Sequence, residues 1–341
     1  MRRGVRRRGR AVLALGVAVT AMLSACSSGA DADSATDGSV TVSHAFGETV
    51  VPDDPQRIVS VGLTEQDTLL ALGVVPVGVT EWYGEQPDAT WPWAHDLLGG
   101  AHPEVLSQTD GIQFEKVTAL EPDLIIGTNA GMSEDDYTRL SAIAPTIAHS
   151  DPDSPYFEPW DQQARTIGLA LGKEAEANAL VDDVRAQYRE AAQAHPEFAS
   201  KKAVLLQNAL YDNQAIAYQD GLSTDFLTSL GFEIPSELNA FVTEEDAQAY
   251  IPLENLSVLD AADVLLWATE GPDDRAALEA EPIYGTLEEV RENRLVFTDG
   301  ITAGAIYFTS PLSLPYLLDS LVPAFSSTLA GSGPATTNTP A

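Results

Sequence analysis

The sequence predicts an α/β protein with two lobes, each built on a central, mostly parallel sheet, and one long rigid α-helix that joins them. Short β-rich runs alternate with helical stretches from Val40 onward, a pattern typical of parallel sheets covered by helices. A long helix predicted over residues 174–194 interrupts this alternation. The alternation restarts with KKAVLLQ at residues 201–207, so the chain divides into two α/β halves of similar size.

The N-terminal lobe is predicted over residues 49–156. Thr64 and Asp67 have the spacing of a capping box before a helix that stops at Gly73. A Trp-, Pro- and Gly-rich loop is predicted over 81–110, and Ser133 is expected to cap a helix. The strands predicted for this lobe are 49–52, 57–62, 74–80, 124–127 and 145–150, with a short helix at 114–123 and the helix capped by Ser133 running through 140.

Residues 157–196 are predicted to be the linking helices, divided at Gly172. In the second helix Ala177, Val181, Val184 and Tyr188 recur at spacings of four and three, which places them on one face.

The C-terminal lobe is predicted over residues 197–325, followed by a disordered tail over 326–341. Its predicted strands are 201–207, 215–218, 264–269 and 295–300, and its predicted helices are 224–230, 252–263, 273–281 and 311–325.

The N-terminus has the pattern of a secretory signal. Six arginines in the first ten residues precede a short apolar run and the segment LSAC, which ends at Cys26. This segment resembles the lipobox of bacterial lipoproteins. We therefore predict a lipoprotein signal peptide over 1–25 and a lipidated Cys26 with a flexible tether over 26–48. The alternative is an ordinary secretory signal with a free cysteine, and the sequence leaves Sec and twin-arginine export both open.

Composition excludes several classes of function. The chain of 341 residues has a net charge of −33 and a pI near 4.2, which argues against nucleic-acid binding. One cysteine excludes a disulfide scaffold and a multi-cysteine zinc site. The five histidines are isolated, and the sequence has no nucleophile elbow, Walker loop or HExxH motif. We therefore predict no catalytic residues, no protein-bound metal and no cofactor.

The candidate ligand-binding residues lie in loops that follow predicted strands, where α/β sheets bind their ligands. Aromatic side chains in these loops suit a large, partly planar ligand in a cleft between lobes. The alternative is that each ring packs in the core of its own lobe. The predicted ligand-binding residues are Trp82, Tyr83, Asn129, Tyr156, Tyr211, Trp267 and Tyr307.

Four segments carry a specific resemblance: PQRIVSVGLTEQDTLLALGVVPVGVTEW, FEKVTALEPDLIIGT, LENLSVLDAADVLLWAT and YFTSPLSLPYLLDSLVP. They resemble the cluster A (class III) periplasmic solute-binding proteins of ABC importers, in the branch for ferric siderophores, haem and cobalamin. The resemblance covers roughly residues 50–323. It implies a monomeric receptor, lipid-anchored on the outer face of the bacterial cytoplasmic membrane, whose two lobes close little around a ligand.

The resemblance also implies docking on a permease through one glutamate per lobe. The matching residues are Glu115 in FEKV and Glu254 in LENL, each at the second position of a short helix before a buried strand. The alternative is a glutamate that only stabilises a helix N-terminus.

The charge of the mature chain sets the expected ligand. Removing residues 1–25 removes six arginines and no acids, which leaves 12 basic against 51 acidic residues and a net charge of −39. Such a field attracts cations and repels trianionic complexes. We therefore predict a neutral or cationic ferric siderophore, such as a trihydroxamate, with Asn129 or one arginine donating to it. The alternatives are a haem or cobalamin receptor of the same fold, with Tyr83, Tyr211 or Met132 as a possible axial ligand for haem, and, at lower weight, a secreted enzyme.

Overall fold

The computed structural model describes residues 38–153, 156, 158–242 and 248–337. The predicted signal peptide and Cys26 lie outside these residues. Within the described ranges, no helix is both long enough and apolar enough to cross a membrane.

The N-terminal lobe contains a five-stranded sheet in the order β5-β4-β3-β6-β7, and every pair of neighbours is parallel. β5 lies inside the predicted 81–110 loop, which also forms a short helix, α2. The bounds are β3 (Ile58–Ser60), α1 (Glu65–Ala71), β4 (Gly78–Glu81), η1 (Pro87–Ala89), α2 (Pro92–His95), η2 (Asp96–Leu98), β5 (Glu104–Ser107), α3 (Phe114–Ala119), β6 (Leu124–Gly127), α4 (Glu134–Ser141) and β7 (Thr146–Ala148).

Each face of this sheet has its own core, because neighbouring residues of a strand point to opposite faces. Ile58, Leu124 and Ile126 pack with α1 and the linking helices, while Val59 and Ile125 pack on the other face with α3 and α4. At α4 the predicted cap is confirmed: Ser133 and Asp136 form a complete capping box.

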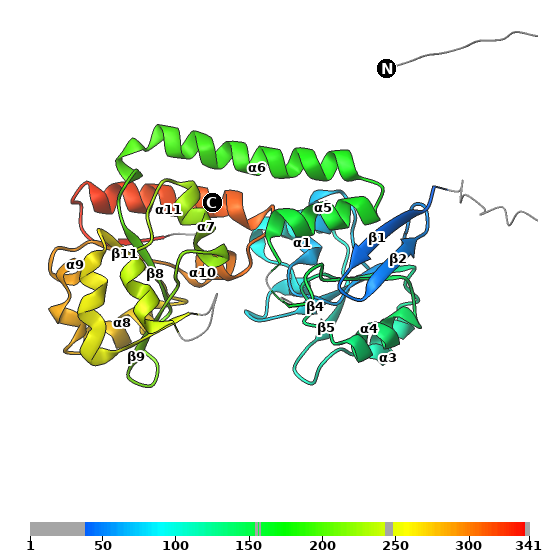
Figure 1. Ribbon diagram of the computed structural model, residues 1–341, viewed down its shortest axis with the longest axis horizontal. Coiled ribbons are helices and arrows are strands. Elements are labelled where there is room, and N and C mark those ends of the chain that lie inside the picture. Colours follow the sequence, from blue (N-terminus) through cyan, green and yellow to red (C-terminus); the bar gives the residue numbers. More distant parts are fainter. Residues whose placement is uncertain (1–37, 154–155, 157, 243–247, 338–341) are drawn as a thin grey trace, which may run out of the picture. The chain divides into compact units, whose positions relative to one another are not determined.

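An antiparallel hairpin, β1 (Val40–His44) and β2 (Gly47–Val51), precedes the sheet (Figure 1). The prediction of a flexible tether up to residue 48 is therefore wrong from residue 40 onward. Val42 and Val51 are buried in the core of the lobe, and Thr49 Oγ1 donates to the carbonyl of Thr146 at 2.8 Å. Apolar burial and this hydrogen bond fix the hairpin on the edge of the fold.

The linking helices are α5 (Trp160–Ala170) and α6 (Glu174–Ala194). Gly172, with φ +65°, lies between them, as its position in the sequence predicts. On α6, Ala177 packs in the core of the N-terminal lobe, whereas Val184 and Tyr188 pack in the core of the C-terminal lobe. One helix thus contributes to both cores, and the predicted fold class is confirmed.

The C-terminal lobe contains a six-stranded mixed sheet in the order β10-β9-β8-β11-β12-β13, in which β9 is antiparallel to both neighbours. The bounds are η3 (Pro196–Phe198), β8 (Ala203–Gln207), β9 (Gln214–Ala217), η4 (Leu222–Thr224), α7 (Asp225–Ser229), η5 (Ser236–Phe241), β10 (Ala249–Pro252), η6 (Leu253–Ala261), β11 (Val264–Ala268), α8 (Pro272–Ala280), η7 (Tyr284–Thr286), α9 (Glu288–Arg291), β12 (Leu295–Phe297), α10 (Gly300–Tyr307), α11 (Ser313–Leu329) and β13 (Ala335–Thr336).

The structure of this lobe differs from the prediction in three ways. The predicted helix 252–263 is a 3₁₀-helix, η6, and α10 was not predicted at all. The predicted disordered tail is ordered at least to Thr337, because α11 continues to Leu329 and β13 pairs in parallel with β12. Thr337 is buried and its amide donates to the carbonyl of Phe297 at 2.9 Å, so these residues are part of the sheet.

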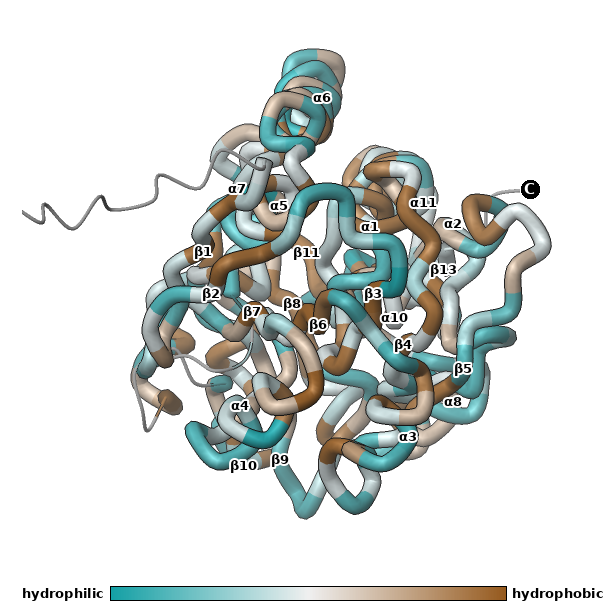
Figure 2. The backbone as a smooth tube through the Cα atoms, turned by 90° about the vertical axis from the view of Figure 1, so that its right-hand side faces the viewer, coloured by the Kyte–Doolittle hydropathy of each residue, from teal (hydrophilic) through white to brown (hydrophobic). Residues whose placement is uncertain are grey.

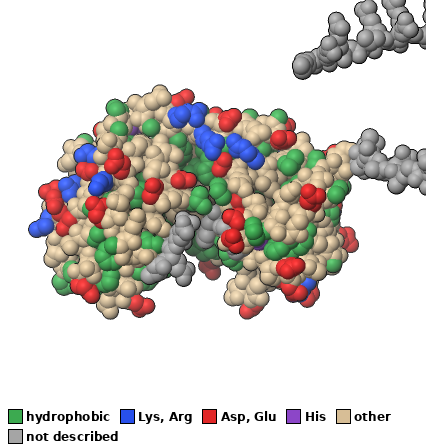
Figure 3. Space-filling view, viewed as in Figure 1, with side chains coloured by type: hydrophobic (Ala, Val, Ile, Leu, Met, Phe, Trp, Pro, Cys, Tyr) green, Lys and Arg blue, Asp and Glu red, His purple; other side chains and the backbone are tan. Residues whose placement is uncertain are grey.

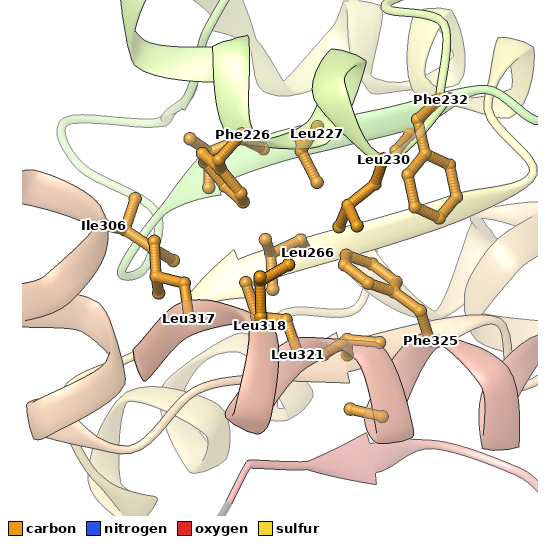
Figure 4. Close-up of a cluster of buried hydrophobic side chains, with 14 of the residues drawn as sticks. Phe226, Leu227, Leu230, Phe232, Leu266, Ile306, Leu317, Leu318, Leu321 and Phe325 are labelled. Atoms are coloured by element: carbon orange, nitrogen blue, oxygen red, sulfur yellow. The ribbon is translucent and has the colours of Figure 1, made fainter. Parts of the chain in front are cut away.

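The larger core of this lobe lies between the sheet, α7 and α11 (Figure 4). Leu266 of β11 points into it between Phe226 of α7 and Leu317 of α11. Hydrophobic residues lie along the hairpin β1–β2 and the central strands (Figure 2). α6 is mainly hydrophilic, as expected for a helix that buries side chains on one face only.

Candidate functional site

Aromatic side chains from both lobes meet between β4 and α10. Trp82 and Tyr83 follow the end of β4, and Tyr307 and Phe308 end α10. The ring centroids of Trp82 and Phe308 are 5.9 Å apart, and those of Tyr83 and Tyr307 are 6.3 Å apart. We name these rings, with two tryptophans of the α2 region, the bridging aromatic group: Trp82, Tyr83, Trp91, Trp93, Tyr307 and Phe308.

Trp91 and Trp93 were not predicted. Their rings stack at 5.1 Å with an interplanar angle of 6°. Trp91 lies against Gly304 of α10, where an added Cβ would be 2.2 Å from the ring. Glycine at 304 therefore lets a tryptophan of one lobe approach the backbone of the other.

Asp67 of α1 connects this group to the C-terminal lobe through hydrogen bonds. Its fully buried carboxylate accepts from Trp93 Nε1 at 2.7 Å and from the hydroxyl of Ser310. Burial raises the pKa of Asp67 to about 6, and these hydrogen bonds oppose the rise. The capping box expected from Thr64 and Asp67 is absent, because the Thr64 hydroxyl donates to Gln163 of α5 instead.

Glu65, two residues earlier, is also fully buried. Its carboxylate accepts from the amides of Asn129 at 2.7 Å and Thr64 at 3.0 Å, and from the hydroxyl of Thr128. Burial raises the pKa of Glu65 despite these donors. Glu65 therefore ties the loop after β6 to the start of α1.

The network around Glu65 changes the interpretation of Asn129, the predicted ligand donor. Asn129 is 4% exposed, and its Nδ2 donates to Thr64 Oγ1 at 3.1 Å. The structure thus places this amide inside the N-terminal lobe rather than on a surface that a ligand reaches.

Trp267 is a second correction. Its side chain has no exposed surface and packs on the opposite face of β11, where Tyr284 lies 6.0 Å away between ring centroids. Because side chains alternate along a strand, Trp267 points away from the face that Leu266 and Ala268 share. Trp267 is therefore a core residue, and the prediction assigned its side chain to the wrong face of the strand.

Tyr156 and Tyr211 are both accessible, at 40% and 42% exposure. Tyr156 lies over Gly131, where any Cβ would collide with its ring. The hydroxyl of Tyr211 donates to the side-chain oxygen of Asn208 at 3.2 Å, in the amide orientation that also lets Asn208 donate to Asp274. Both tyrosines therefore stay candidates for ligand contact.

Tyr218 and Glu270 act electrostatically on two rings of the bridging aromatic group. Neither was predicted, although Glu270 directly follows the predicted strand 264–269. Burial first, then Glu270 and Tyr218, raise the pKa of the Tyr83 hydroxyl. Burial is also the largest cause that raises the pKa of Tyr307, followed by Tyr218, Tyr83 and Glu270. Its hydroxyl donates to the carbonyl of Ala268 at 3.4 Å, which seats Tyr307 on the end of β11.

Basic side chains are engaged elsewhere. Arg57 donates to the carbonyls of Leu120 and Glu121, and Arg139 lies over the Phe114 ring. Lysine and arginine gather along the linking helices and at the outer edge of the C-terminal lobe, whereas acidic side chains flank the hollow between the lobes (Figure 3). In the described part of the chain, no arginine or lysine stacks on or bonds to the bridging aromatic group.

A cavity of about 300 Å³ lies beneath α6, lined among others by Trp160, Arg185, Arg189 and Asp225. Arg185 donates to Asp161 at 2.8 Å at its edge. Among the described residues, no group of three or more histidine, cysteine or acidic side chains could hold a metal ion.

The predicted docking glutamates are both exposed. Glu115 is the second residue of α3 and Glu254 is the second residue of η6. Neither forms an ion pair with another described residue, so both carboxylates are open to a partner.

Comparison with known proteins gives the class of the molecule. Residues 58–302 match the family "Periplasmic binding protein", and the chain belongs to this family. A solved periplasmic solute binding protein from Mycobacterium smegmatis is 47% identical, with a TM-score of 0.81, over 86% of this chain and 99% of that chain.

Two further relatives are informative. The Bacillus subtilis protein named "Probable siderophore-binding lipoprotein YfiY" is 28% identical over 90% of this chain and 95% of its own length. Streptococcus pneumoniae PiaA, solved in complex with ferrichrome, shares the fold with a TM-score of 0.71 at 24% identity, over 86% of this chain and 99% of its own.

Proposed function

We propose that the protein is the extracytoplasmic receptor of an ABC importer and that it captures a ferric siderophore between its lobes, for delivery to a permease. The observation that carries this proposal is the bridging aromatic group, which both lobes supply and to which no described basic side chain is bonded. Apolar rings with few polar groups suit a bulky chelate that keeps its own metal ligands. The protein then needs no catalytic group, no cofactor and no metal ligand.

The ligand class follows from charge. Relatives are named for ferric citrate as well as for siderophores, so the family alone does not choose between anionic and neutral complexes. In this chain the charge of Glu270 acts on Tyr83 and Tyr307, and Arg275, the basic residue nearest to Glu270 in the sequence, lies over the Phe297 ring and bonds to Glu279. A neutral or cationic ferric trihydroxamate fits this site, because an anionic complex would meet repulsion without a counter-charge.

A haem receptor fits less well. A tyrosinate ligand to haem iron needs a hydroxyl that loses its proton readily, whereas burial raises the pKa of both Tyr83 and Tyr307. Among the described residues, no histidine ring contacts the bridging aromatic group. Mixing the protein with haemin and recording the absorption spectrum tests this alternative, since axial ligation would produce a Soret shift.

The ligand assignment is tested by titrating the mature protein with ferrioxamine B, a ferric catecholate and ferric citrate while following tryptophan fluorescence. The hydroxamate should bind tightest. Trp82→Ala should weaken its binding about tenfold or more, because an aromatic contact to the ligand is lost. Leu97→Ala, which removes another exposed apolar side chain of this lobe, is the matched control and should bind normally. Tighter binding of the catecholate would contradict the charge argument.

Location and docking complete the proposal. The receptor would be a monomer, and lipidation of Cys26 would hold it at the outer face of the cytoplasmic membrane. Glu115 and Glu254 would pair with arginines of the permease. Relatives named as lipoproteins support the first point, and the exposure of both glutamates supports the second.

Docking is tested with the double variant Glu115→Ala, Glu254→Ala. It should bind the chelate normally but fail to support uptake, since only the contact with the permease is removed. Glu134→Ala with Glu174→Ala removes two exposed glutamates from the first turns of other helices and should leave uptake intact. Uptake that survives in the first variant would show that these glutamates only stabilise their helices.

A further inference from the structure

We propose that Glu270 and Tyr83 form a cation subsite, which takes an ammonium group carried by the bound chelate and makes Glu270 the residue that determines specificity. This inference rests on the function proposed above and goes beyond it, since it names the ligand group and the residues that recognise it. Four observations lead to it.

The first observation is the position of Glu270. It lies two residues after Ala268, whose carbonyl accepts a hydrogen bond from Tyr307 at 3.4 Å. The ring of Tyr307 is in turn 6.3 Å from that of Tyr83 in the other lobe. Glu270 is exposed, and its charge acts on both hydroxyls. The carboxylate therefore lies where the two lobes face each other.

The second observation is a contrast with Asp274, the other carboxylate at this end of β11. Asp274 accepts hydrogen bonds from the amides of Glu270 and Gly271, both at 2.9 Å, and from the side chain of Asn208. These donors engage Asp274 in the turn itself. The carboxylate of Glu270 has no hydrogen bond or ion pair with any described residue. Partial burial, and then the charge of Asp274, raise its pKa, which agrees with the absence of a counter-charge among the described residues.

The third observation is the hydroxyl of Tyr83, which is buried and has no hydrogen-bond partner among the described residues. Buried polar groups are normally bonded, so an unpartnered one calls for a ligand or water. An ammonium group offers three donors. It could bond to the carboxylate of Glu270 and to the oxygen of Tyr83, and aromatic faces of the bridging group would favour its charge.

The fourth observation is that no basic side chain in the described part of the chain forms an ion pair with Glu270. Arg275 is the basic residue nearest to Glu270 in the sequence. Its guanidinium lies 4.5 Å from the centroid of the Phe297 ring and its Nε donates to Glu279 at 2.8 Å. Among the described residues, no other basic side chain forms a hydrogen bond or ion pair with Glu270. Solvent covers this carboxylate in the absence of ligand, and the position is open to a positive charge that the ligand carries.

The experiment compares ferrioxamine B, which carries a terminal ammonium group, with its N-acetylated form, which lacks that charge. The wild-type protein should bind the ammonium form about tenfold tighter, as expected for a partly desolvated charge pair. Glu270→Gln should remove this preference by weakening only the ammonium form. Tyr83→Phe should reduce the preference by a smaller factor. Titration by tryptophan fluorescence at low and high salt gives each affinity.

The matched control is Glu281→Gln, which removes the same charge from an exposed position of the same lobe. It should keep the full preference. Equal binding of both chelates by the wild type, or a preference that survives Glu270→Gln, would overturn the subsite while upholding the proposed function. Failure to bind either chelate would contradict the proposed function and the subsite with it.

Discussion

Each lobe has two carboxylates close together in sequence, and one of each pair interacts with the bridging aromatic group: Asp67 accepts from Trp93, and the charge of Glu270 acts on Tyr83 and Tyr307. The two pairs are used differently. In the N-terminal lobe Glu65 and Asp67 are both fully buried, and both accept hydrogen bonds. In the C-terminal lobe Asp274 also accepts hydrogen bonds from backbone amides, but the exposed carboxylate of Glu270 has no hydrogen bond or ion pair with any described residue.

The difference separates groups that build the fold from a group available to a ligand. A buried carboxylate is stable only when donors replace the water it has lost. Glu65 finds them in backbone amides, whose positions the fold fixes, and Asp67 finds them in side chains from both lobes. Glu270 keeps contact with solvent and needs no such donors. Removing the buried carboxylates should therefore change stability, whereas removing Glu270 should change binding.

The largest effect is expected from Glu65→Ala. The change leaves the amides of Asn129 and Thr64 buried without an acceptor, and we expect it to lower the free energy of unfolding by about 3–4 kcal/mol. Urea denaturation of the mature protein measures this. Glu270→Ala is the comparison and should stay within about 0.5 kcal/mol of the wild type. Equal effects of the two changes would abolish the distinction between the two pairs.

The next prediction concerns the contact between Trp91 of the N-terminal lobe and Gly304 of the C-terminal lobe. Gly304→Ala places a Cβ 2.2 Å from the ring of Trp91, so the ring or α10 must shift, at a cost of about 1–3 kcal/mol. The cost should largely disappear in a Trp91→Ala background, because the clash is then gone. Gly285→Ala, where a Cβ meets nothing within 4 Å, is the control. A penalty that persists without Trp91 would show that the glycine serves α10 alone.

The same residues show what the sequence could and could not predict. The buried strands follow from apolar runs, and Gly172 from the break between two helical patterns, since these depend on local periodicity. Trp91 and Trp93 could not be predicted as part of the site, because their burial depends on Gly304 and Asp67, which are distant in sequence. Trp267 was placed wrongly because a fully apolar strand carries no alternation to say which face is which.

The hydrogen bonds of Thr64 and Asp67 also could not be predicted from local sequence patterns. The spacing of Thr64 and Asp67 fits a capping box, yet the tertiary partners Gln163, Trp93 and Ser310 take both side chains. Hydrogen-bond partners outside the helix, one acceptor and two donors, replace the cap. The capping-box spacing therefore did not predict the structure, because tertiary hydrogen bonds determine where these side chains lie.

The smallest expected effect is the contribution of Asp67 to the pH dependence of the free energy of unfolding. Its pKa of about 6 in the folded protein lies above the ordinary value of 3.8, so the folded state binds a proton more tightly than the unfolded chain does. The stability from Asp67 therefore rises as the pH falls through 6 and is lost again as the pH rises. Between pH 7.5 and 5 this amounts to about 1–1.5 kcal/mol.

Asp67→Asn should remove that part of the pH dependence of urea denaturation, whatever its effect at a single pH. The control is Asp182→Asn on the exposed side of α6, which should keep the wild-type slope. Other groups also titrate: burial raises the pKa of Glu65 and lowers the pKa of His44 and His149, which act in opposite directions on stability. The difference between variant and wild type cancels them. An unchanged slope in Asp67→Asn would mean that water reaches this carboxylate and that the link between the lobes opens in solution.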